Sequence, residues 1–294
     1  MKSKRSNAAY ASSILRRPLQ RCFPLFLLPV VTAFAIGFVW PFLQGLFLSF
    51  TKFKTTSDWE WLGIGNYIKA FADESFRYSF GYTALYAIVS LVLINVIAFA
   101  VAYALTQKIK GSNLFRTVFF MPNLIGGIVL GWIWQVIING VLYRYGATIV
   151  SDPKYGFWGL VVLMNWQNVG YMMVIYIAAI QNIPGDLLEA AAIDGAGWWT
   201  TLTKIIIPSV MPSITICLFM TMTNGFKLFD QNLALTAGEP GKQTELLALN
   251  IYNTFYGRTG FEGVGQAKAV VFTIIVATIA LLQLRITRSK EVEQ

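Results

Sequence analysis

The sequence predicts an all-α membrane protein with six transmembrane helices and both termini in the cytoplasm. Three observations support this fold class. Hydrophobic residues make up 56% of the 294 residues and charged residues only 13%, a balance too apolar for a soluble domain of this size. Six apolar stretches are suited to crossing a bilayer. Basic residues cluster beside the stretch ends that would face the cytoplasm.

The six apolar stretches define a transmembrane domain over residues 23–288. A span needs roughly 20 mostly apolar residues to cross about 30 Å of hydrocarbon. None of the six stretches contains Asp, Glu, Lys or Arg. Their predicted bounds are Phe23–Phe50, Ser79–Thr106, Thr117–Val141, Phe157–Ile183, Ile205–Phe226 and Ala269–Leu284.

Basic tails flank the predicted spans. Residues 1–22 carry Lys and Arg without a single acid, which places the amino terminus in the cytoplasm, and residues 289–294 form a second cytoplasmic tail. A cleaved secretory signal is the alternative for the start of the chain. Its apolar core would run only about 7–15 residues, so the longer run here favours retention. The two cysteines, Cys22 and Cys217, suggest neither a disulfide nor a metal site.

Short connections join the first three spans. The outside loop Thr51–Arg77 includes a predicted interfacial helix over Asn66–Phe71. The inside turn Gln107–Arg116 makes the second and third spans antiparallel neighbours. Pro122 predicts a bend within the third span.

Polar side chains interrupt the fourth span and the end of the fifth. The run Asn165–Met173 carries amides that are costly against lipid unless they face a cavity or another helix. The run Asn224–Asp230 combines an amide, rings and charges, which suits the hydroxyls and the C–H face of a carbohydrate. A helix end that frays into the membrane interface explains this second run equally well, and both interpretations stay open.

The longest outside segment covers about residues 231–268. A turn at Leu235–Gly241 is followed by a predicted helix over Thr244–Phe255 and a glycine-rich return. Such a segment is well placed to contact a protein that delivers a substrate.

A polar stretch rich in small residues, Glu189–Pro208, separates the fourth and fifth spans. Gly195 permits a tight turn, and Pro208 is predicted to begin the next helix. The pattern predicts a helix–turn–helix on the membrane surface, whose apolar ridge fits a partner's groove. An ordinary loop with a surface helix is the alternative. The ridge consists of Leu187, Leu188, Ala191 and Ala192.

No energy source for transport is evident within the chain. Proton-coupled carriers usually need ionisable groups near the membrane midplane, but the spans carry no charge and the chain has no histidine. A P-loop is also missing, because Gly241–Lys242 is followed by Gln243 and Thr236 stands where the first glycine should be. Any ATPase is therefore a separate subunit.

The spacing of the polar stretch resembles the signature loop of bacterial ABC-importer permeases, although Ile207 replaces the usual Leu before the proline. The resemblance implies the type I ABC-importer permease fold, with a coupling loop over about residues 184–208 that fits an ATPase subunit. Its implied coupling residues are Glu189, Ala190, Ala191, Asp194, Gly195 and Pro208.

The segment from Phe229 to Tyr252 resembles the carbohydrate branch of these permeases, the maltose-type and multiple-sugar importers. The family's LTGGGP is LTAGEP here, so Ala237 and Glu239 depart from the pattern and the contacts of that loop differ. Matched residue by residue, the resemblance implies sugar contacts at Val169, Gly170, Met173, Asn224, Phe226, Lys227 and Phe229.

The resemblance implies a transport subunit rather than an enzyme: the permease of an ATP-driven, binding-protein-dependent sugar importer in the bacterial cell membrane. Expected partners are a second permease, two ATPase subunits, an external sugar-binding protein, the sugar and membrane lipid, but no nucleic acid. The chain itself is expected to hold no cofactor, metal or catalytic residue, since ATP and magnesium belong to the ATPase. Alternatives are a permease of the same fold for glycerol phosphate, a polyamine or an amino acid, and, more distantly, a stand-alone carrier or channel.

Overall fold

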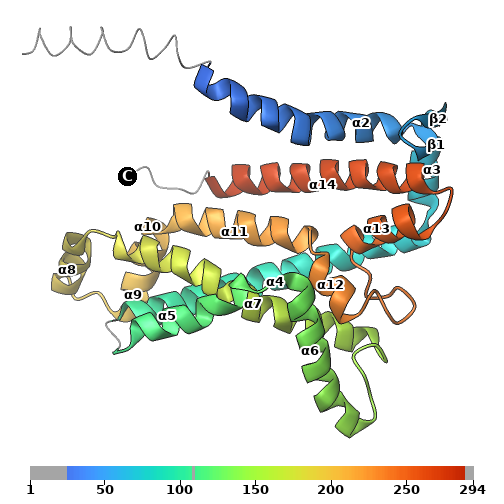
Figure 1. Ribbon diagram of the computed structural model, residues 1–294. Helices are drawn as coiled ribbons and strands as arrows, with labels where there is room; N and C mark the ends of the chain where they lie inside the picture. The colour runs from blue at the N-terminus through green and yellow to red at the C-terminus, as the bar shows by residue number, and fades with distance from the viewer. Residues whose placement is uncertain (1–24, 108–109, 289–294) are drawn as a thin grey trace, which may run out of the picture.

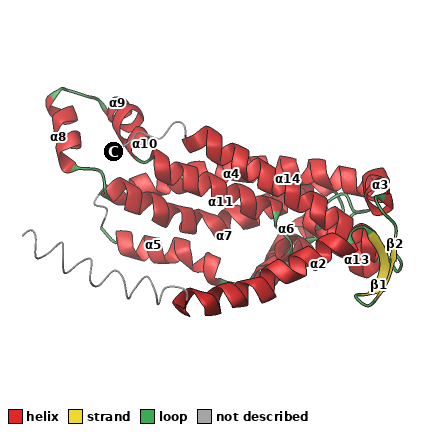
Figure 2. Cartoon of the chain, turned by 90° about the horizontal axis from the view of Figure 1, so that it is seen from above, coloured by secondary structure: helices red, strands yellow, loops and turns green. Residues whose placement is uncertain are grey.

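The computed structural model describes residues 25–107 and 110–288, and the fold is almost entirely helical (Figure 1). The predicted tails at 1–22 and 289–294, together with Cys22, lie outside the described residues. The long helices run along one common direction, whereas α6 turns away from them (Figure 1). Figure 2 shows the same bundle from above, with the helix α8 at one end and the strands at the other.

The first helix covers Leu25–Leu48 and contains a π-helical turn at Ala35–Val39, directly before α2 (Trp40–Leu48). The remaining strands and α-helices are β1 Thr51–Thr55, β2 Asp58–Trp61, α3 Gly65–Ala72, α4 Glu74–Thr106, α5 Ser112–Phe120, α6 Gly127–Leu142, α7 Pro153–Gln181, α8 Gly185–Ile193, α9 Trp198–Thr201, α10 Ile207–Ser209, α11 Met211–Phe226, α12 Asp230–Leu235, α13 Leu247–Gly257 and α14 Glu262–Arg288. Shorter 3₁₀ or π-helical turns lie at Met121–Leu124, Tyr143–Tyr145 and Leu202–Ile206.

Among the described residues, five helices are long and apolar enough to cross a membrane. They are the first helix, α4, α6 with the turn that follows it, α7 and α14. A sixth span is obtained if Trp198–Ser209 and Met211–Phe226 count as one, although these two pieces are bent by 70° relative to each other. The structure therefore gives five candidate spans and one broken span, where the sequence predicts six.

The predicted third span, Thr117–Val141, is not one helix. The chain leaves α5 at Phe120, passes through a 3₁₀ turn, Met121–Leu124, and starts α6 only at Gly127. Pro122 lies in that turn, where its ring and missing N–H cannot continue the α-helix. As a result α5 packs against α7, whereas α6 packs against α12.

The start of the fifth span also differs from the prediction. Pro208 belongs to the three-residue helix α10, and α11 begins at Met211 after the break at Val210. Pro208 and Pro212 each remove a backbone donor near this break, which favours the bend. The sixth helix starts earlier than predicted, at Glu262, and Gly263 in its first turn lies against the Thr51 carbonyl, where a side chain would not fit.

A β-hairpin after the first helix is not predicted from the sequence. Strands β1 and β2 are antiparallel, with Thr51 opposite Trp61 and Phe53 opposite Trp59. The helix predicted at Asn66–Phe71 is confirmed as α3, Gly65–Ala72. The Asn66 amide fastens α3 to the hairpin by donating to the backbone carbonyls of Ser49 at 3.0 Å and Thr51 at 2.7 Å.

The core of the bundle lies between α4, α7 and α11. Ile94, Met172 and Cys217 are among its buried side chains. A polar link crosses this core: the Tyr176 hydroxyl donates to Asn95 Oδ1 at 2.7 Å, and Asn95 Nδ2 donates to Thr221 Oγ1 at 3.2 Å. These buried polar groups therefore satisfy one another without water.

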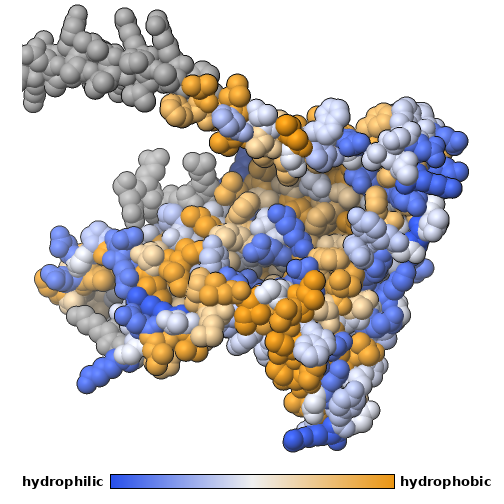
Figure 3. All heavy atoms as spheres, in the orientation of Figure 1, coloured by the Kyte–Doolittle hydropathy of each residue, from blue (hydrophilic) through white to orange (hydrophobic). Residues whose placement is uncertain are grey.

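The outer surface is apolar over much of its area. Large hydrophobic side chains are exposed along the first helix and along α6. Figure 3 shows hydrophobic residues dominating the visible face of α6, while hydrophilic residues gather at the two ends of the bundle. Such a surface fits burial in lipid or against other membrane helices.

Candidate functional site

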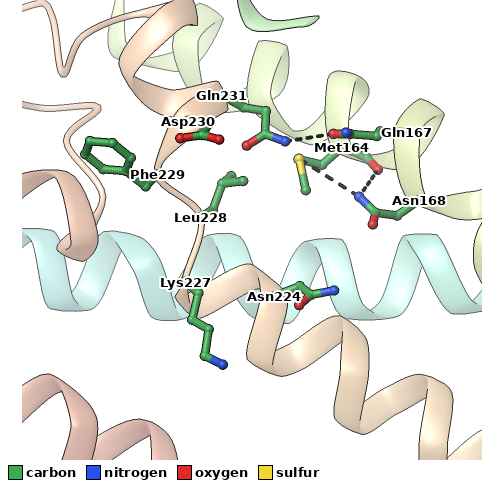
Figure 4. A pocket seen from close by; sticks show the side chains of 9 residues that line it. All are labelled: Met164, Gln167, Asn168, Asn224, Lys227, Leu228, Phe229, Asp230 and Gln231. Atoms are coloured by element: carbon green, nitrogen blue, oxygen red, sulfur yellow. Dashed lines mark hydrogen bonds between the residues drawn. The ribbon is translucent and has the colours of Figure 1, made fainter. Parts of the chain in front are cut away.

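A polar cavity of about 300 Å³ opens where the carboxyl end of α11, the start of α12 and the middle of α7 meet (Figure 4). The chain reaches this place because α11 ends at Phe226, and the short non-helical segment Lys227–Phe229 connects it to α12. The lining residues are Met164, Gln167, Asn168, Asn224, Lys227, Leu228, Phe229, Asp230 and Gln231.

Two glutamines bridge the cavity. Gln231 Nε2 donates to Gln167 Oε1 at 2.8 Å, and Figure 4 shows the two side chains pointing toward each other. Gln167 Nε2 in turn donates to the backbone carbonyl of Ile125 at 3.3 Å, at the break between α5 and α6. This chain of amides fixes α7 to α12 and orients polar atoms toward the cavity.

Three polar side chains at the cavity have spare hydrogen-bonding capacity. Asn224, Lys227 and Asp230 are exposed, and no side-chain hydrogen bond or ion pair joins them to another described residue. Their amide, ammonium and carboxylate groups supply both donors and acceptors. The cavity can therefore bind a ligand rich in hydroxyl groups.

Phe229 places an aromatic ring beside these polar groups. Its ring centroid lies 5.1 Å from that of Tyr252 on α13, with the planes at 55°. Figure 4 shows Phe229 at the opposite end of the cavity from Asn168. An aromatic face next to free donors and acceptors is the combination that the sequence predicts for carbohydrate binding.

The structure brings together three of the seven sugar contacts implied by the sequence, namely Asn224, Lys227 and Phe229. The other four are packed inside this chain. Val169 and Met173 belong to the core of α4, α7 and α11, and Phe226 packs against Ala87 and Val276. A side chain at Gly170 would overlap the Phe119 carbonyl oxygen, so this glycine lets α5 approach α7.

Gln167, Asn168 and Gln231 line the cavity but are not among the contacts implied by the sequence. The signal for Gln167 and Asn168 was present, since amides inside a span are costly unless they face a cavity or another helix. Gln231 gave no such signal because it lies beyond the predicted end of the fifth span. Only the fold places it opposite Gln167.

The predicted surface helix is confirmed as α8, and it protrudes from one end of the bundle (Figures 1 and 2). Gly195 ends the turn after it with φ of 73°, a left-handed conformation that favours glycine. The backbone N–H groups of Gly195 and Ala196 donate to the carbonyls of Ala192 and Ala191 at 3.2 and 2.9 Å. This pair of bonds is the Schellman motif, so the helix end is sharply defined.

Most coupling residues implied by the sequence are accessible. Glu189, Ala190, Asp194 and Gly195 are exposed, Ala191 is buried and Pro208 is half-buried. Apolar side chains beside them are also exposed, with exposed fractions of 48% for Leu187, 37% for Leu188 and 86% for Ile193. An isolated helix of nine residues with an uncovered apolar side is suited to contact another protein.

A buried ionic network fixes the end of the bundle opposite α8 (Figure 1). Lys268 on α14 is fully buried, and its Nζ donates to Asp73 Oδ2 at 2.7 Å, Asn250 Oδ1 at 2.9 Å and Thr254 Oγ1 at 2.8 Å. Burial would raise the pKa of Asp73, but the hydrogen bond and charge of Lys268, with the charge of Arg258, lower that pKa below its ordinary value. The network therefore stabilises α13 against α14 and the start of α4.

No metal centre is apparent in the described part of the chain. No group of three or more His, Cys, Asp or Glu side chains lies close enough there to hold a metal ion. Cys217 is fully buried between helices.

Known proteins with similar sequences are transport permeases. The chain is 42% identical over 277 residues to the probable starch degradation products transport system permease protein AmyD of Thermoanaerobacterium thermosulfurigenes, covering 92% of this chain and 94% of that protein. It is 30% identical over 267 residues to the multiple sugar-binding transport system permease protein MsmF of Streptococcus mutans, covering 87% of this chain and 92% of that protein.

A solved structure shares the fold. A bacterial ABC transporter involved in the import of the acidic polysaccharide alginate contains a chain that superposes with a TM-score of 0.79 at 20% identity, covering 94% of this chain and 98% of that one. The model of one transport family, described as binding-protein-dependent transport system inner membrane component, matches residues 110–289. The chain therefore belongs to the family of binding-protein-dependent transport system inner membrane components.

Proposed function

We propose that this chain is the permease subunit of an ATP-driven sugar importer in the bacterial cell membrane, and that its substrate is an oligosaccharide. The observation that carries this proposal is the placement of two features at opposite ends of α11. The loop containing α8 joins the start of the helix, and the polar and aromatic cavity lies at its end. With 16 residues, α11 separates the two by about 24 Å.

The chemistry of the cavity favours a neutral, hydroxyl-rich substrate. Its formal charges, among the described lining residues, are one cation, Lys227, and one anion, Asp230. A phosphate ester such as glycerol phosphate would gain from several cations, and a polyamine from several anions. Amides and a ring beside this balanced pair fit a sugar better than either. The AmyD and MsmF relatives carry starch degradation products and multiple sugars in their names, which agrees with this substrate class.

The positions of α8 and the cavity at opposite ends of α11 suggest how the translocation path opens and closes. We infer that α8 docks on an ATPase subunit through Glu189, Ala190 and the exposed apolar side chains beside them, which are Leu187, Leu188 and Ile193. ATP binding by a pair of such subunits would move α8 and, with it, the ends of α7 and α11 that it joins. This movement exposes the cavity alternately to the outside and to the cytoplasm.

The complete transporter in this proposal contains a second permease, two ATPase subunits and an external binding protein. ATP and magnesium bind to the ATPase subunits, because this sequence has no P-loop. The six-span topology with both termini in the cytoplasm is part of the same proposal. It counts the bent pair Trp198–Ser209 and Met211–Phe226 as one span.

Uptake of labelled sugars tests this function. A strain lacking the chain is complemented with wild type or with the double variant Asn224→Ala, Phe229→Ala, and is given labelled monosaccharides, glucose oligomers and xylose oligomers. We expect uptake of an oligosaccharide that depends on the chain and falls in the double variant. Restored uptake of an amino acid, a polyamine or glycerol phosphate, with no sugar taken up, would contradict the proposal.

A further inference from the structure

A second cavity adjoins the first on its outer side. It has a volume of about 380 Å³ and lies between α13 and α14. Phe229 lines both cavities, so the two share a wall. The other lining residues of the outer cavity are Ala248, Ile251, Tyr252, Phe255, Tyr256, Gly265, Gln266 and Ala269.

Aromatic rings form a continuous row from the polar cavity outward. The ring centroids are 5.1 Å apart for Phe229 and Tyr252, 4.9 Å for Tyr252 and Tyr256, and 4.8 Å for Tyr256 and Phe255. The three α13 rings occur at positions i, i+3 and i+4, so they share one face of that helix. The row therefore begins at the polar cavity and continues along α13.

The two tyrosine rings in the middle of this row are open to a ligand. The exposed fractions of Tyr252 and Tyr256 are 42% and 72%, and neither hydroxyl bonds to another described residue. The side chain of Gln266, which also lines the outer cavity, makes no hydrogen bond with the described residues. Rings with free hydroxyl and amide groups beside them offer both kinds of contact that a sugar uses.

The face of α13 opposite the rings is held firmly in place. Asn250 Nδ2 donates to Ser75 Oγ at 2.8 Å and to Glu245 Oε2 at 2.7 Å, and Lys268 binds Asn250 and Thr254. These buried contacts fix the helix without using its aromatic side. A rigid surface loses less entropy when it binds a ligand, so the rings are ordered in advance.

We infer that this row, Phe229, Tyr252, Tyr256 and Phe255, is a second binding surface for the same substrate. The inference rests on the proposed function and makes it more specific. A short sugar occupies the polar cavity alone, and a longer oligosaccharide continues from Phe229 onto the α13 rings. The row therefore selects for substrate length. Tyrosines at membrane ends also anchor proteins in the interface, and this alternative predicts no dependence on length.

A competition assay separates the two explanations. The complete transporter with its binding protein is reconstituted in vesicles and supplied with a mixture of two-unit and six-unit glucose oligomers that carry different labels. Xylose oligomers of the same two lengths are tested in parallel. The measured quantity is the ratio of long to short oligomer taken up, for wild type and for the double variant Tyr252→Ala, Tyr256→Ala. Each variant uses the same binding protein, so a change in the ratio arises in the permease.

We expect the double variant to lower the ratio about tenfold, which corresponds to about 1.4 kcal/mol. Tyr252→Phe keeps the ring and loses only the hydroxyl, so it should lower the ratio less than Tyr252→Ala does. Tyr145→Ala is the control for interfacial anchoring, because Tyr145 is 80% exposed at the tip of α6, away from the row. It should not change the ratio.

Other outcomes overturn the inference. An unchanged ratio in the double variant, with normal uptake of both oligomers, means that the rings do not contact the substrate. An equal loss of both oligomers with poor recovery of partner subunits means that the row contacts a protein instead. A wild-type transporter that imports neither oligomer series contradicts the proposed function itself, and the inference with it.

Discussion

Replacing Gly195 by alanine tests whether the turn after α8 sets the docking surface. No atom lies within 4 Å of the position that a Cβ at Gly195 would occupy, so alanine meets no steric obstacle. The φ of 73° remains unfavourable for an L-residue, at a cost of about 1–2 kcal/mol. The whole effect of Gly195→Ala is therefore conformational.

The cost falls on α8 rather than on the whole fold. The helix has nine residues and protrudes from the bundle, and isolated helices of this length are only marginally stable. Loss of the Gly195 conformation removes the backbone bonds from Gly195 and Ala196 that close the helix end. A cost of 1–2 kcal/mol corresponds to a factor of about 5–30 in the population of the intact turn. We expect the affinity for the ATPase subunit to fall by a similar factor.

The assay is a binding titration of purified ATPase subunit against the detergent-solubilised permease. Gly195→Asn is the matched control, because asparagine tolerates the left-handed conformation better than alanine does. Gly195→Arg adds a large cation beside Asp194 to the same backbone cost, so we expect it to bind ATPase more weakly than Gly195→Ala. Membrane insertion should be normal for all three. If Gly195→Ala and Gly195→Arg bind the ATPase subunit as wild type does, α8 is not the docking element.

Three further predictions concern stability. Lys268→Met removes the main partner of the half-buried Asp73 and a hydrogen bond from each of the buried side chains of Asn250 and Thr254. We expect the free energy of unfolding to fall by about 1–3 kcal/mol, as seen in thermal unfolding in detergent. Lys242→Met on an exposed loop should have little effect, and equal effects of the two variants would contradict this role for the network. Because the pKa of Asp73 is lowered in the folded state, its stabilising contribution is complete above the ordinary value of 3.8 and is lost as the pH falls through the lowered pKa. Asp73→Asn should therefore weaken the loss of stability in acid. An unchanged dependence of stability on pH in this variant would contradict the role of Asp73. Gly170→Ala forces α5 away from α7 and should lower the free energy of unfolding by about 1–3 kcal/mol. Gly81→Ala, whose added Cβ meets no atom within 4 Å, should leave it unchanged. A Gly170→Ala variant as stable as wild type would refute the close packing of these two helices.

Local patterns of sequence predicted the features that depend on nearby residues. The helix α8 and its turn follow from the apolar spacing before Gly195, and α3 follows from the run Asn66–Phe71. The long apolar helices follow from hydropathy alone. In each case the information lies within one or two turns of the residues concerned.

Features that depend on distant residues were missed. Hydropathy treats Thr117–Val141 as one span, because it does not distinguish a bend at Pro122 from a complete break. The hairpin Thr51–Trp61 has exposed lysines on one side of β1 and lacks a characteristic turn dipeptide, so its pairing was not evident. The ion pair of Asp73 and Lys268 joins residues 195 positions apart and exists only in the folded chain.

In the candidate site, too, the residues that depend on local sequence were predicted, and those that depend on helix packing were not. Asn224, Lys227 and Phe229 lie in one run of unusual composition, and the structure places all three at the cavity. The residues on α7 depend on the register between two helices, which the sequence does not give. The structure turns Gln167 and Asn168 toward the cavity and packs Val169 and Met173 into the core.

The central claim is that α8 lies on the cytoplasmic side while the rings of α13 lie outside. The direct measurement is labelling of Ala192→Cys and Tyr256→Cys, each in a Cys22→Ser, Cys217→Ser background, with a maleimide that does not cross membranes. Both positions are exposed. We predict that Tyr256→Cys is labelled in intact cells and Ala192→Cys only in inverted vesicles. Labelling of Ala192→Cys in intact cells would contradict the account.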